Sequence, residues 1–309
     1  MNNKTLEYYS KRHEFFLKNI FHDIDIPSKR IKKAILYTLF PGGKRIRPML
    51  VYLCGELFGI KKKSILDIIA VSIELIHCYS LIHDDLPSMD NDDYRRGKLS
   101  CHKFFDEATA ILTGNAMQAF ATDFLLKKLS KLLKPNKIIS IVHILLLSSG
   151  LQGIISGQSL DLHITKNHHL NKKTLYKIYM LKTEKLISAC FKMVYKIPTN
   201  PSSLIIKIVN KYAHYLSLAL QIQNDYLDFY NKNFSGKKRS SDFINQKKTF
   251  ATLYDKNKLN NIINTYFQKA KNIILPLGKK SKNLIFLTKK LENYTNPNII
   301  NYKYKQSKK

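Results

Sequence analysis

The chain has 309 residues, of which 44% are hydrophobic, enough to bury a sizeable core in one large domain or two. Its net charge of +30 raises nucleic acid or an anionic membrane as a partner, because a basic field concentrates polyanions. The basic residues are 45 Lys and only 7 Arg, and we interpret most of the lysines as a solvated surface. Composition therefore excludes a disordered chain, and we expect no nucleic-acid partner.

The sequence gives no sign of export or of a membrane anchor. It contains four cysteines, Cys54, Cys78, Cys101 and Cys190. They form no CxxC pair, so neither a zinc site nor a disulfide framework is indicated. The N-terminus lacks the apolar stretch of a signal peptide, and the longest apolar run, 138–147, is too short to span a bilayer. We therefore expect a cytoplasmic protein with no stable membrane anchoring.

Apolar residues recur at intervals of three and four, for example from Ile65 to Tyr79 and from Leu204 to Leu216. No convincing alternation with a period of two appears. Helix-breaking residues separate the periodic stretches at Pro27, Pro41 to Gly43, Gly59, Gly97, Pro135, Pro198 to Pro201, Gly236 and Pro276 to Gly278. The pattern predicts an all-α fold in a single domain, 1–309, with a basic tail at 301–309 that frays.

Five aspartates lie within ten residues, and a pair of arginines follows them. They are Asp84, Asp85, Asp90, Asp92 and Asp93, followed by Arg95 and Arg96. Carboxylates at this density repel one another unless a cation binds, and their oxygens suit a hard ion such as Mg²⁺. The guanidinium groups match the geometry of phosphate. The segment therefore predicts a metal and diphosphate site.

The two outer aspartates of this motif are separated by a proline. On an ideal helix Asp84 and Asp90 would point about 240° apart and could not share an ion. Pro87 removes a backbone donor and clashes with the preceding turn, so we expect residues 86–89 to loop out by about two residues. The two carboxylates would then be neighbours at an effective spacing of four.

A second polar group lies in QIQNDYLD, residues 221–228. Asn224 and Asp228 are four residues apart and share one face of a helix, with Asp225 beside them. A third group is PGGKRIRP, residues 41–48, where the glycines allow an anion to approach the backbone. Its basic residues, Lys44, Arg45 and Arg47, add charge and forked donors. This group predicts an anion site.

These motifs, with GQSLD at 157–161, LKT at 181–183 and GKKRSSD at 236–242, resemble in order and spacing the bacterial farnesyl diphosphate synthases of the trans-polyprenyl synthase family. The resemblance covers about residues 29–253. It implies an isoprenoid synthase fold, a bundle of long helices around a central cavity with the two acidic motifs facing each other. It also implies a Mg²⁺-dependent prenyltransferase and a homodimer. The reaction would condense isopentenyl diphosphate with dimethylallyl and geranyl diphosphate to C15 farnesyl diphosphate, by ionisation, condensation and elimination.

The same resemblance implies a role for individual residues. Two or three Mg²⁺ ions would bind Asp84, Asp85, Asp90, Asn224 and Asp228. The allylic diphosphate would bind Arg95, Lys182, Thr183, Gln221, Lys237 and Lys247. Of these, Lys182, Thr183 and Gln221 would act in catalysis, with the oxygens of Thr183 and Gln221 facing the allylic cation. Isopentenyl diphosphate would bind Gly43, Lys44, Arg47, His77 and Arg96. Tyr79, five residues before the first aspartate, would close the pocket and stop elongation near C15.

The chain departs from the family pattern at three positions. Asn224 stands where the second acidic motif normally begins with Asp, so the ion there should bind more weakly. Glu184 stands where a small residue is expected, and Gln246 replaces a glycine. These departures predict a modest activity.

Four other interpretations remain at this stage. A synthase of longer prenyl chains, C20 or more, would use the same motifs, and a terpene cyclase would share Asn224 but not Asp228 or Lys232. A basic helical protein that binds nucleic acid would explain the net charge but not the five aspartates. An inactive remnant would explain Asn224, because the loss of one ligand can cripple a metal site.

Overall fold

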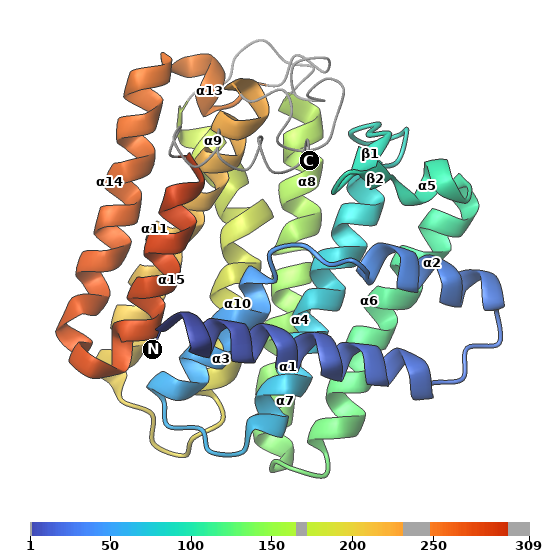
Figure 1. Ribbon diagram of the computed structural model, residues 1–309, viewed down its shortest axis with the longest axis horizontal. Coiled ribbons are helices and arrows are strands. Elements are labelled where there is room, and N and C mark those ends of the chain that lie inside the picture. The colour runs from blue at the N-terminus through green and yellow to red at the C-terminus, as the bar shows by residue number, and fades with distance from the viewer. Residues whose placement is uncertain (1, 165–171, 231–247, 296–309) are drawn as a thin grey trace.

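The computed structural model describes residues 2–164, 172–230 and 248–295, and most of them are helical (Figure 1). The elements in chain order are α1 (Asn2–Asp23), α2 (Lys29–Leu39), α3 (Ile46–Leu57), α4 (Lys63–Asp84), β1 (Tyr94–Arg95), β2 (Lys98–Leu99), α5 (Cys101–Phe104), α6 (Glu107–Leu129), α7 (Pro135–Ser149), α8 (Ile154–Ile164), α9 (Lys172–Tyr179), the π-helical turn η1 (Met180–Glu184), α10 (Lys185–Tyr195), α11 (Ser203–Tyr230), α13 (Phe250–Leu253), α14 (Lys256–Ile274), the 3-10 turn η2 (Leu275–Ser281), α15 (Lys282–Glu292) and the 3-10 turn η3 (Asn293–Thr295). The prediction of an all-α fold is confirmed.

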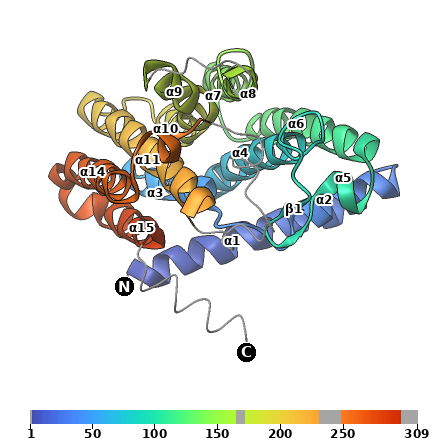
Figure 2. The same ribbon diagram turned by 90° about the horizontal axis from the view of Figure 1, so that it is seen from above.

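Helix α4 lies in the middle of the bundle. It packs against α3, α6 and α10, while α14 and α15 lie on one side of the molecule and α5 and α6 on the other (Figure 2). Its apolar stripe, which includes Ile69, Ile73 and Ile76, is buried along almost the whole helix. The buried apolar side chains form one continuous cluster that runs from α1 to α15. Burial of this cluster, rather than helix propensity, supplies most of the stabilisation of such a bundle.

The helix ends follow the residues that the sequence marks as breakers. Asp106 caps α6 by accepting a hydrogen bond from the backbone N–H of Thr109 at 2.6 Å. Pro135 occupies the first turn of α7, where its missing N–H has no cost. Helix α1 is fixed across the bundle by Arg12, which donates two hydrogen bonds to the Asp67 carboxylate of α4 at 2.7 and 2.6 Å. These contacts fix the position of α4 and therefore of its C-terminal end.

One feature of the fold was not predicted. Strands β1 and β2 form a small antiparallel hairpin, in which Tyr94 pairs with Leu99 and Arg95 with Lys98. Strands of two residues are too short to show an alternation of apolar and polar positions. The hairpin, α5, α9 and α13 all lie at one end of the bundle (Figure 1). The acidic motif directly precedes β1 and therefore lies at that end.

Among the described residues, two stretches are long and apolar enough to cross a bilayer by length and composition alone, Lys63–Asp84 and Pro135–His163. The first is the central helix α4, whose most apolar window is 89% buried inside the protein. The second joins α7 and α8, and its window is only 44% buried. Burial in the core accounts for the composition of α4, whereas α7 and α8 leave apolar surface uncovered.

Candidate active site

The first acidic motif loops out between Asp84 and Asp90. Helix α4 ends at Asp84, and the backbone N–H of Asp90 donates to the carbonyl of Asp84 at 2.9 Å. In a regular α-helix that carbonyl accepts from the residue four positions on, so two residues are inserted here. A second bond, from the N–H of Asp92 to the carbonyl of Asp85 at 3.1 Å, closes the loop. The excursion predicted at Pro87 is confirmed.

The environment of Asp84 favours a cation. Burial raises the pKa of Asp84 to about 6, the charge of Lys182 opposes this shift, and the charge of Asp90 adds to it. A bound cation stabilises a carboxylate that burial and a like charge disfavour. Asp84, Asp85 and Asp90 offer the hard oxygen atoms that Mg²⁺ prefers. The residues present therefore fit that ion.

Side chains of the protein itself contact several carboxylates of this motif. Within residues 2–164, 172–230 and 248–295, no three His, Cys, Asp or Glu side chains are already gathered as in a finished metal site. Asp85 is instead engaged by Arg95, whose Nε donates to its two oxygens at 2.9 and 3.2 Å. The Nη2 atom of Arg95 also donates to Asp92 at 3.2 Å. Binding of a cation would therefore compete with Arg95 for Asp85.

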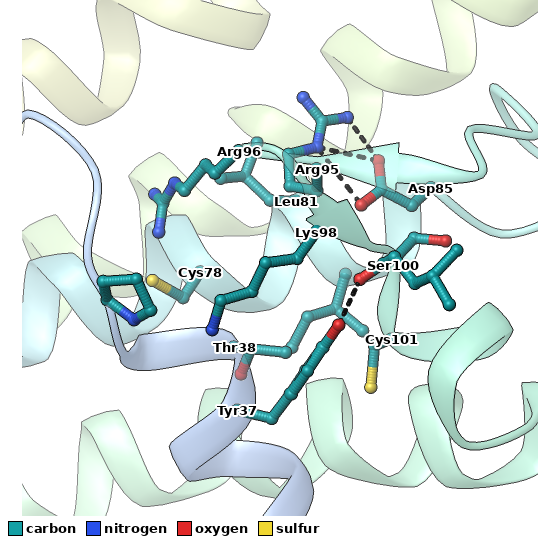
Figure 3. A pocket seen from close by; sticks show the side chains of 13 residues that line it. Tyr37, Thr38, Cys78, Leu81, Asp85, Arg95, Arg96, Lys98, Ser100 and Cys101 are labelled. Atoms are coloured by element: carbon teal, nitrogen blue, oxygen red, sulfur yellow. Dashed lines mark hydrogen bonds and ion pairs between the residues drawn. The ribbon is translucent and has the colours of Figure 1, made fainter. Parts of the chain in front are cut away.

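The two arginines that follow the motif point to different places (Figure 3). Arg95 turns onto Asp85, whereas Arg96, which has a φ of 55°, extends toward Cys78 and away from Asp85 (Figure 3). Gly43 lies against Arg96, because a Cβ at Gly43 would come within 2.9 Å of three guanidinium atoms. A side chain at this position would displace the Arg96 guanidinium from its place. The arginine pair thus reaches both the acidic motif and the glycine-rich segment.

Basic groups from three segments gather near Gly43. Burial lowers the pKa of His77, and the charges of Arg47 and Arg96 lower it further, while Glu74 opposes them. The Nε atom of Arg47 is buried and has no hydrogen-bond partner in the described part of the chain. A buried donor without an acceptor is costly, and an anion would satisfy it. The Nζ atom of Lys44 lies 3.7 Å from the centre of the Tyr294 ring, at the far end of the described chain.

Arg45 faces the interior, so the expectation that it contributes to the anion site is wrong. Its side chain is 4% exposed and donates to Glu74 at 2.7 Å, to Glu14 at 2.6 Å and to the carbonyl of Leu39 at 2.6 Å. Each guanidinium nitrogen therefore donates to an acceptor inside the protein, so the group is not available to a ligand. Arg45 instead stabilises the turn between α2 and α3 from the interior of the protein.

The π-helical turn η1 carries Lys182 and Thr183. Lys182 forms an ion pair with Asp161 of α8 at 2.7 Å. Although burial alone would lower the pKa of Lys182, the charges of Asp161, Asp84 and Asp90 raise it above its ordinary value. Helix α8 packs closely here, because a Cβ at Gly157 would lie 2.4 Å from the backbone N of Lys182. π-turns often mark functional sites, and this one aims an ammonium group at the acidic motif.

The second polar motif lies on α11 as the spacing predicts. Asn224 is exposed and Asp228 is partly exposed, whereas Asp225 is buried. One turn before Asn224, Gln221 accepts a hydrogen bond at its Oε1 atom from the hydroxyl of Thr183 at 2.6 Å. The structure therefore joins η1 to α11 through two of the predicted catalytic residues.

Tyr79 lies on α4 below the acidic motif. Five residues along a helix correspond to about 7.5 Å, so its ring lies well below Asp84. The ring is 4% exposed, and the hydroxyl donates to the carbonyl of Ser149, at the end of α7, at 3.3 Å. Burial raises the pKa of Tyr79 to about 12, and the charge of Asp84 adds to the shift. Tyr79 is thus a fixed, neutral ring between α4 and α7.

A family model described as polyprenyl synthetase matches residues 28–274 of this chain. The chain belongs to the polyprenyl synthetase family. A farnesyl diphosphate synthase of Haemophilus influenzae is 38% identical over 252 residues, which cover 81% of this chain and 84% of that protein. A geranyltransferase structure from Legionella pneumophila matches with a TM-score of 0.88 and 46% identity, covering 96% of this chain and 98% of that one.

A second structure of the family bears on the ligands. It is a geranyltransferase from Helicobacter pylori complexed with magnesium and isoprenyl diphosphate, with a TM-score of 0.82 and 31% identity, covering 95% of this chain and 97% of that one. The resemblance drawn from the sequence is confirmed, and with it the isoprenoid synthase fold and the class of prenyl-condensing transferases.

Some predicted residues of the family site lie outside the described residues. These are Lys237 and Lys247, and the tail 301–309 also lies outside the described residues. Conversely, the sequence did not assign Asp161 and Glu74, which pair with Lys182 and Arg45. Glu74 could have been found from the sequence, because an acid on the apolar face of a helix needs a buried partner. The partner of Asp161 lies 21 residues away on another element, which no local pattern shows.

Proposed function

We propose that this chain is a Mg²⁺-dependent farnesyl diphosphate synthase. It would condense isopentenyl diphosphate with dimethylallyl and then geranyl diphosphate, and release the C15 product. One observation carries the proposal. An acidic cluster that fits Mg²⁺ and a basic cluster, in which the buried Nε atom of Arg47 has no hydrogen-bond partner among the described residues, lie on either side of the Arg95 and Arg96 pair.

The acidic side suits an allylic diphosphate that carries metal. Asp84, Asp85 and Asp90 would bind two or three Mg²⁺ ions together with Asn224 and Asp228, and these ions would neutralise the charge that develops on the departing diphosphate. The charges of Asp84 and Asp90 already act on Lys182, whose ammonium group can donate to phosphate oxygens. Arg95 would exchange the Asp85 carboxylate for a phosphate, assisted by Lys237 and Lys247.

The basic side suits a diphosphate without metal. Arg47 and Arg96 offer permanent charges, and Lys44 would add a third from the rim. The pKa of His77 is lowered, so its ring is neutral near pH 7 and donates one N–H without adding charge. Gly43 lets the phosphate approach the backbone.

Chemistry would occur between these two sides. The oxygens of Thr183 and Gln221 would face the allylic cation that forms when the C–O bond breaks. The double bond of isopentenyl diphosphate then attacks this cation, and the proton that leaves goes to the departing diphosphate. No side chain is required as a nucleophile, and Tyr79 would limit the growing chain to C15. Replacing Tyr79 tests the alternative of longer products.

We further propose a cytoplasmic homodimer. Large apolar side chains are exposed on the adjoining helices α6, α7 and α8 and on the turn between α7 and α8, namely Ile111, Leu112, Leu126, Ile139, Leu146, Leu147, Leu151 and Ile155. A monomer rarely exposes so many neighbouring apolar groups, and a second copy would cover them. This face also accounts for the incompletely buried apolar stretch from α7 to α8 without a membrane.

The test of the function is a condensation assay. Purified protein is given isopentenyl and geranyl diphosphate with Mg²⁺, and product formation is followed with and without EDTA. We expect condensation that EDTA abolishes and Mg²⁺ restores. No condensation at any Mg²⁺ concentration, together with a salt-dependent shift of nucleic acid in a gel, would favour the nucleic-acid-binding alternative.

A further inference from the structure

Asp225, the first of the two acids of the second motif, is turned into the protein and accepts hydrogen bonds from three other groups. Its side chain is 4% exposed. One oxygen, Oδ2, accepts hydrogen bonds from the Tyr179 hydroxyl and from the backbone N–H of Phe250, the latter at 3.3 Å. The other oxygen, Oδ1, accepts from the Nε2 atom of Gln221 at 3.1 Å. Tyr179 and Phe250 are themselves buried, so the carboxylate is fixed in place.

The contact with Asp225 decides which way the Gln221 amide points. A carboxylate only accepts hydrogen bonds, so the NH₂ group of Gln221 must face Asp225, and its oxygen must face the other way. That oxygen accepts from the Thr183 hydroxyl at 2.6 Å. The hydroxyl hydrogen of Thr183 is used in this bond. Lone pairs on the Thr183 hydroxyl oxygen and on the Gln221 amide oxygen remain available. Without Asp225, the amide could turn and present hydrogen atoms instead.

We propose that Asp225 is a positioning residue for the ionisation step, which orients Gln221 and, through it, Thr183 so that both present oxygen lone pairs to the allylic cation. Because this role presupposes the prenyl transfer proposed above, it deepens that function and adds no second one. Dipoles that are oriented before the reaction stabilise a developing charge without reorganisation at the moment of reaction. Asp225 acts only through Gln221 and does not contact the substrate.

The alternative is that Asp225 binds metal, as its place in an acidic motif suggests. The geometry favours the positioning role. Asn224 and Asp228, its neighbours in the motif, are exposed or partly exposed on α11, whereas Asp225 is buried among Tyr179, Gln221 and Phe250. A metal bound to Asp225 would have to displace donors that three different elements supply. The two roles differ in their response to Mg²⁺.

The experiment compares Asp225→Asn with Asp228→Asn, a matched change one turn away on the same helix. In Asp225→Asn the new amide nitrogen faces Gln221, whose amide then turns its own nitrogen toward Thr183. We expect kcat to fall about 100-fold, as when one preorganised dipole is lost, with both KM values within about threefold of the original. The half-saturating Mg²⁺ concentration stays unchanged. Asp228→Asn raises that concentration, and added Mg²⁺ restores its rate.

A double variant separates orientation from general damage. In Gln221→Glu with Asp225→Asn, the donor and acceptor ends of the pair are exchanged and the total charge is kept. The Asn nitrogen donates to one Glu oxygen, and the other Glu oxygen accepts from Thr183 and faces the cation. We expect at least tenfold recovery of kcat relative to Asp225→Asn, on the order of what one such contact contributes. A residue that only stabilises the fold would show no such recovery.

The outcomes are distinct. A normal kcat in Asp225→Asn, a loss that high Mg²⁺ repairs, or a double variant no faster than Asp225→Asn would each overturn the positioning role. If Asp225→Asn alone does not fold, by circular dichroism, then Gln221→Glu is compared with the double variant. Adding Asp225→Asn should then raise kcat, and a further loss would overturn the proposal. Absence of condensation by the unaltered chain would instead refute the proposed function.

Discussion

Asn224 and Asp225 are adjacent on α11, but the first side chain faces solvent and the second faces the interior. The side chain of Asn224 is exposed on α11, and that of Asp225 is buried against Tyr179. An amide oxygen can coordinate Mg²⁺, but it carries no charge to attract the ion. In the proposed metal site, the weak ligand would therefore be Asn224 and not the acid beside it.

Asn224→Asp should tighten the apparent affinity for Mg²⁺. A carboxylate about 4 Å from a divalent ion is worth about 2 kcal/mol in water, twice the value for a unit charge, so we expect the half-saturating Mg²⁺ concentration to fall about tenfold. The measurement is a Mg²⁺ titration of the condensation rate. Asn224→Ala is the control and should shift the titration the other way. An unchanged curve for Asn224→Asp would place this side chain outside the metal site.

Tyr79 should set product length through the size of its ring. Tyr79→Ala removes the ring between α4 and α7 and should give products longer than C15, read by chromatography. Tyr79→Phe keeps the ring, loses only the hydrogen bond to Ser149, and should still stop at C15. The alanine change also leaves a cavity that costs about 3 to 5 kcal/mol of stability, so products are compared at low temperature. A Tyr79→Ala enzyme that makes C15 alone contradicts the assignment.

At the scale of elements, the turn η1 and helix α11 are joined at two places. One is the hydrogen bond from Thr183 to Gln221, and the other is the pair of Glu184 and His214, 2.8 Å apart. The sequence marked Glu184 as a departure from the family, and the structure supplies its partner. The hydrogen bond to Glu184 raises the pKa of His214, while partial burial opposes the shift.

This pair should stabilise the protein more at acidic than at alkaline pH. A histidine whose pKa is raised on folding contributes stability that is complete below its unfolded pKa of about 6.5 and is lost as the pH rises through the folded value. Replacing Glu184 by Gln should therefore cost more at pH 6 than at pH 9 in urea unfolding. Because His214 is partly exposed, the difference should stay below about 1 kcal/mol.

A control without a histidine is Glu292→Gln, which breaks the ion pair with Lys271 between α15 and α14. Its cost should be the same at both pH values. An equal cost of Glu184→Gln at pH 6 and pH 9 would show that the charge of His214 makes no contribution.

The elements also show what a sequence can and cannot reveal. The helices and their ends follow from apolar periodicity and from proline and glycine, and the loop at Pro87 follows from backbone sterics alone. The inward turn of Arg45 and the partner of Glu184 could not be found in this way. Each depends on residues about 30 positions away on another helix. Periodicity tells which face of a helix is buried, but not which residue it meets.

At the scale of the whole molecule, a charge of +30 coexists with an uncovered apolar face on α6, α7 and α8. Like charges keep copies of a protein apart unless a specific apolar contact outweighs their repulsion. The face on these helices offers such a contact. We interpret the basic surface as general solvation and this face as the place where two copies meet.

Placing charges on this face should separate the copies. Ile139→Glu with Leu146→Glu puts two carboxylates on exposed positions of α7, and we expect light scattering to report a monomer of about half the original mass. Leu204→Glu, an equally exposed apolar position on α11, is the control and should leave the mass unchanged. A monomeric unaltered chain, or a dimer that survives both charges, would contradict this interface.

The central claim is that the clusters around Arg95 and Arg96 together build a C15 prenyl chain. Mass spectrometry of the products tests it most directly, with purified protein, Mg²⁺, and isopentenyl diphosphate offered with dimethylallyl or geranyl diphosphate. We predict farnesyl diphosphate from either starter, and no product when Mg²⁺ is removed. Products of C20 or longer would contradict the role of Tyr79, and the absence of any condensation would contradict the function itself.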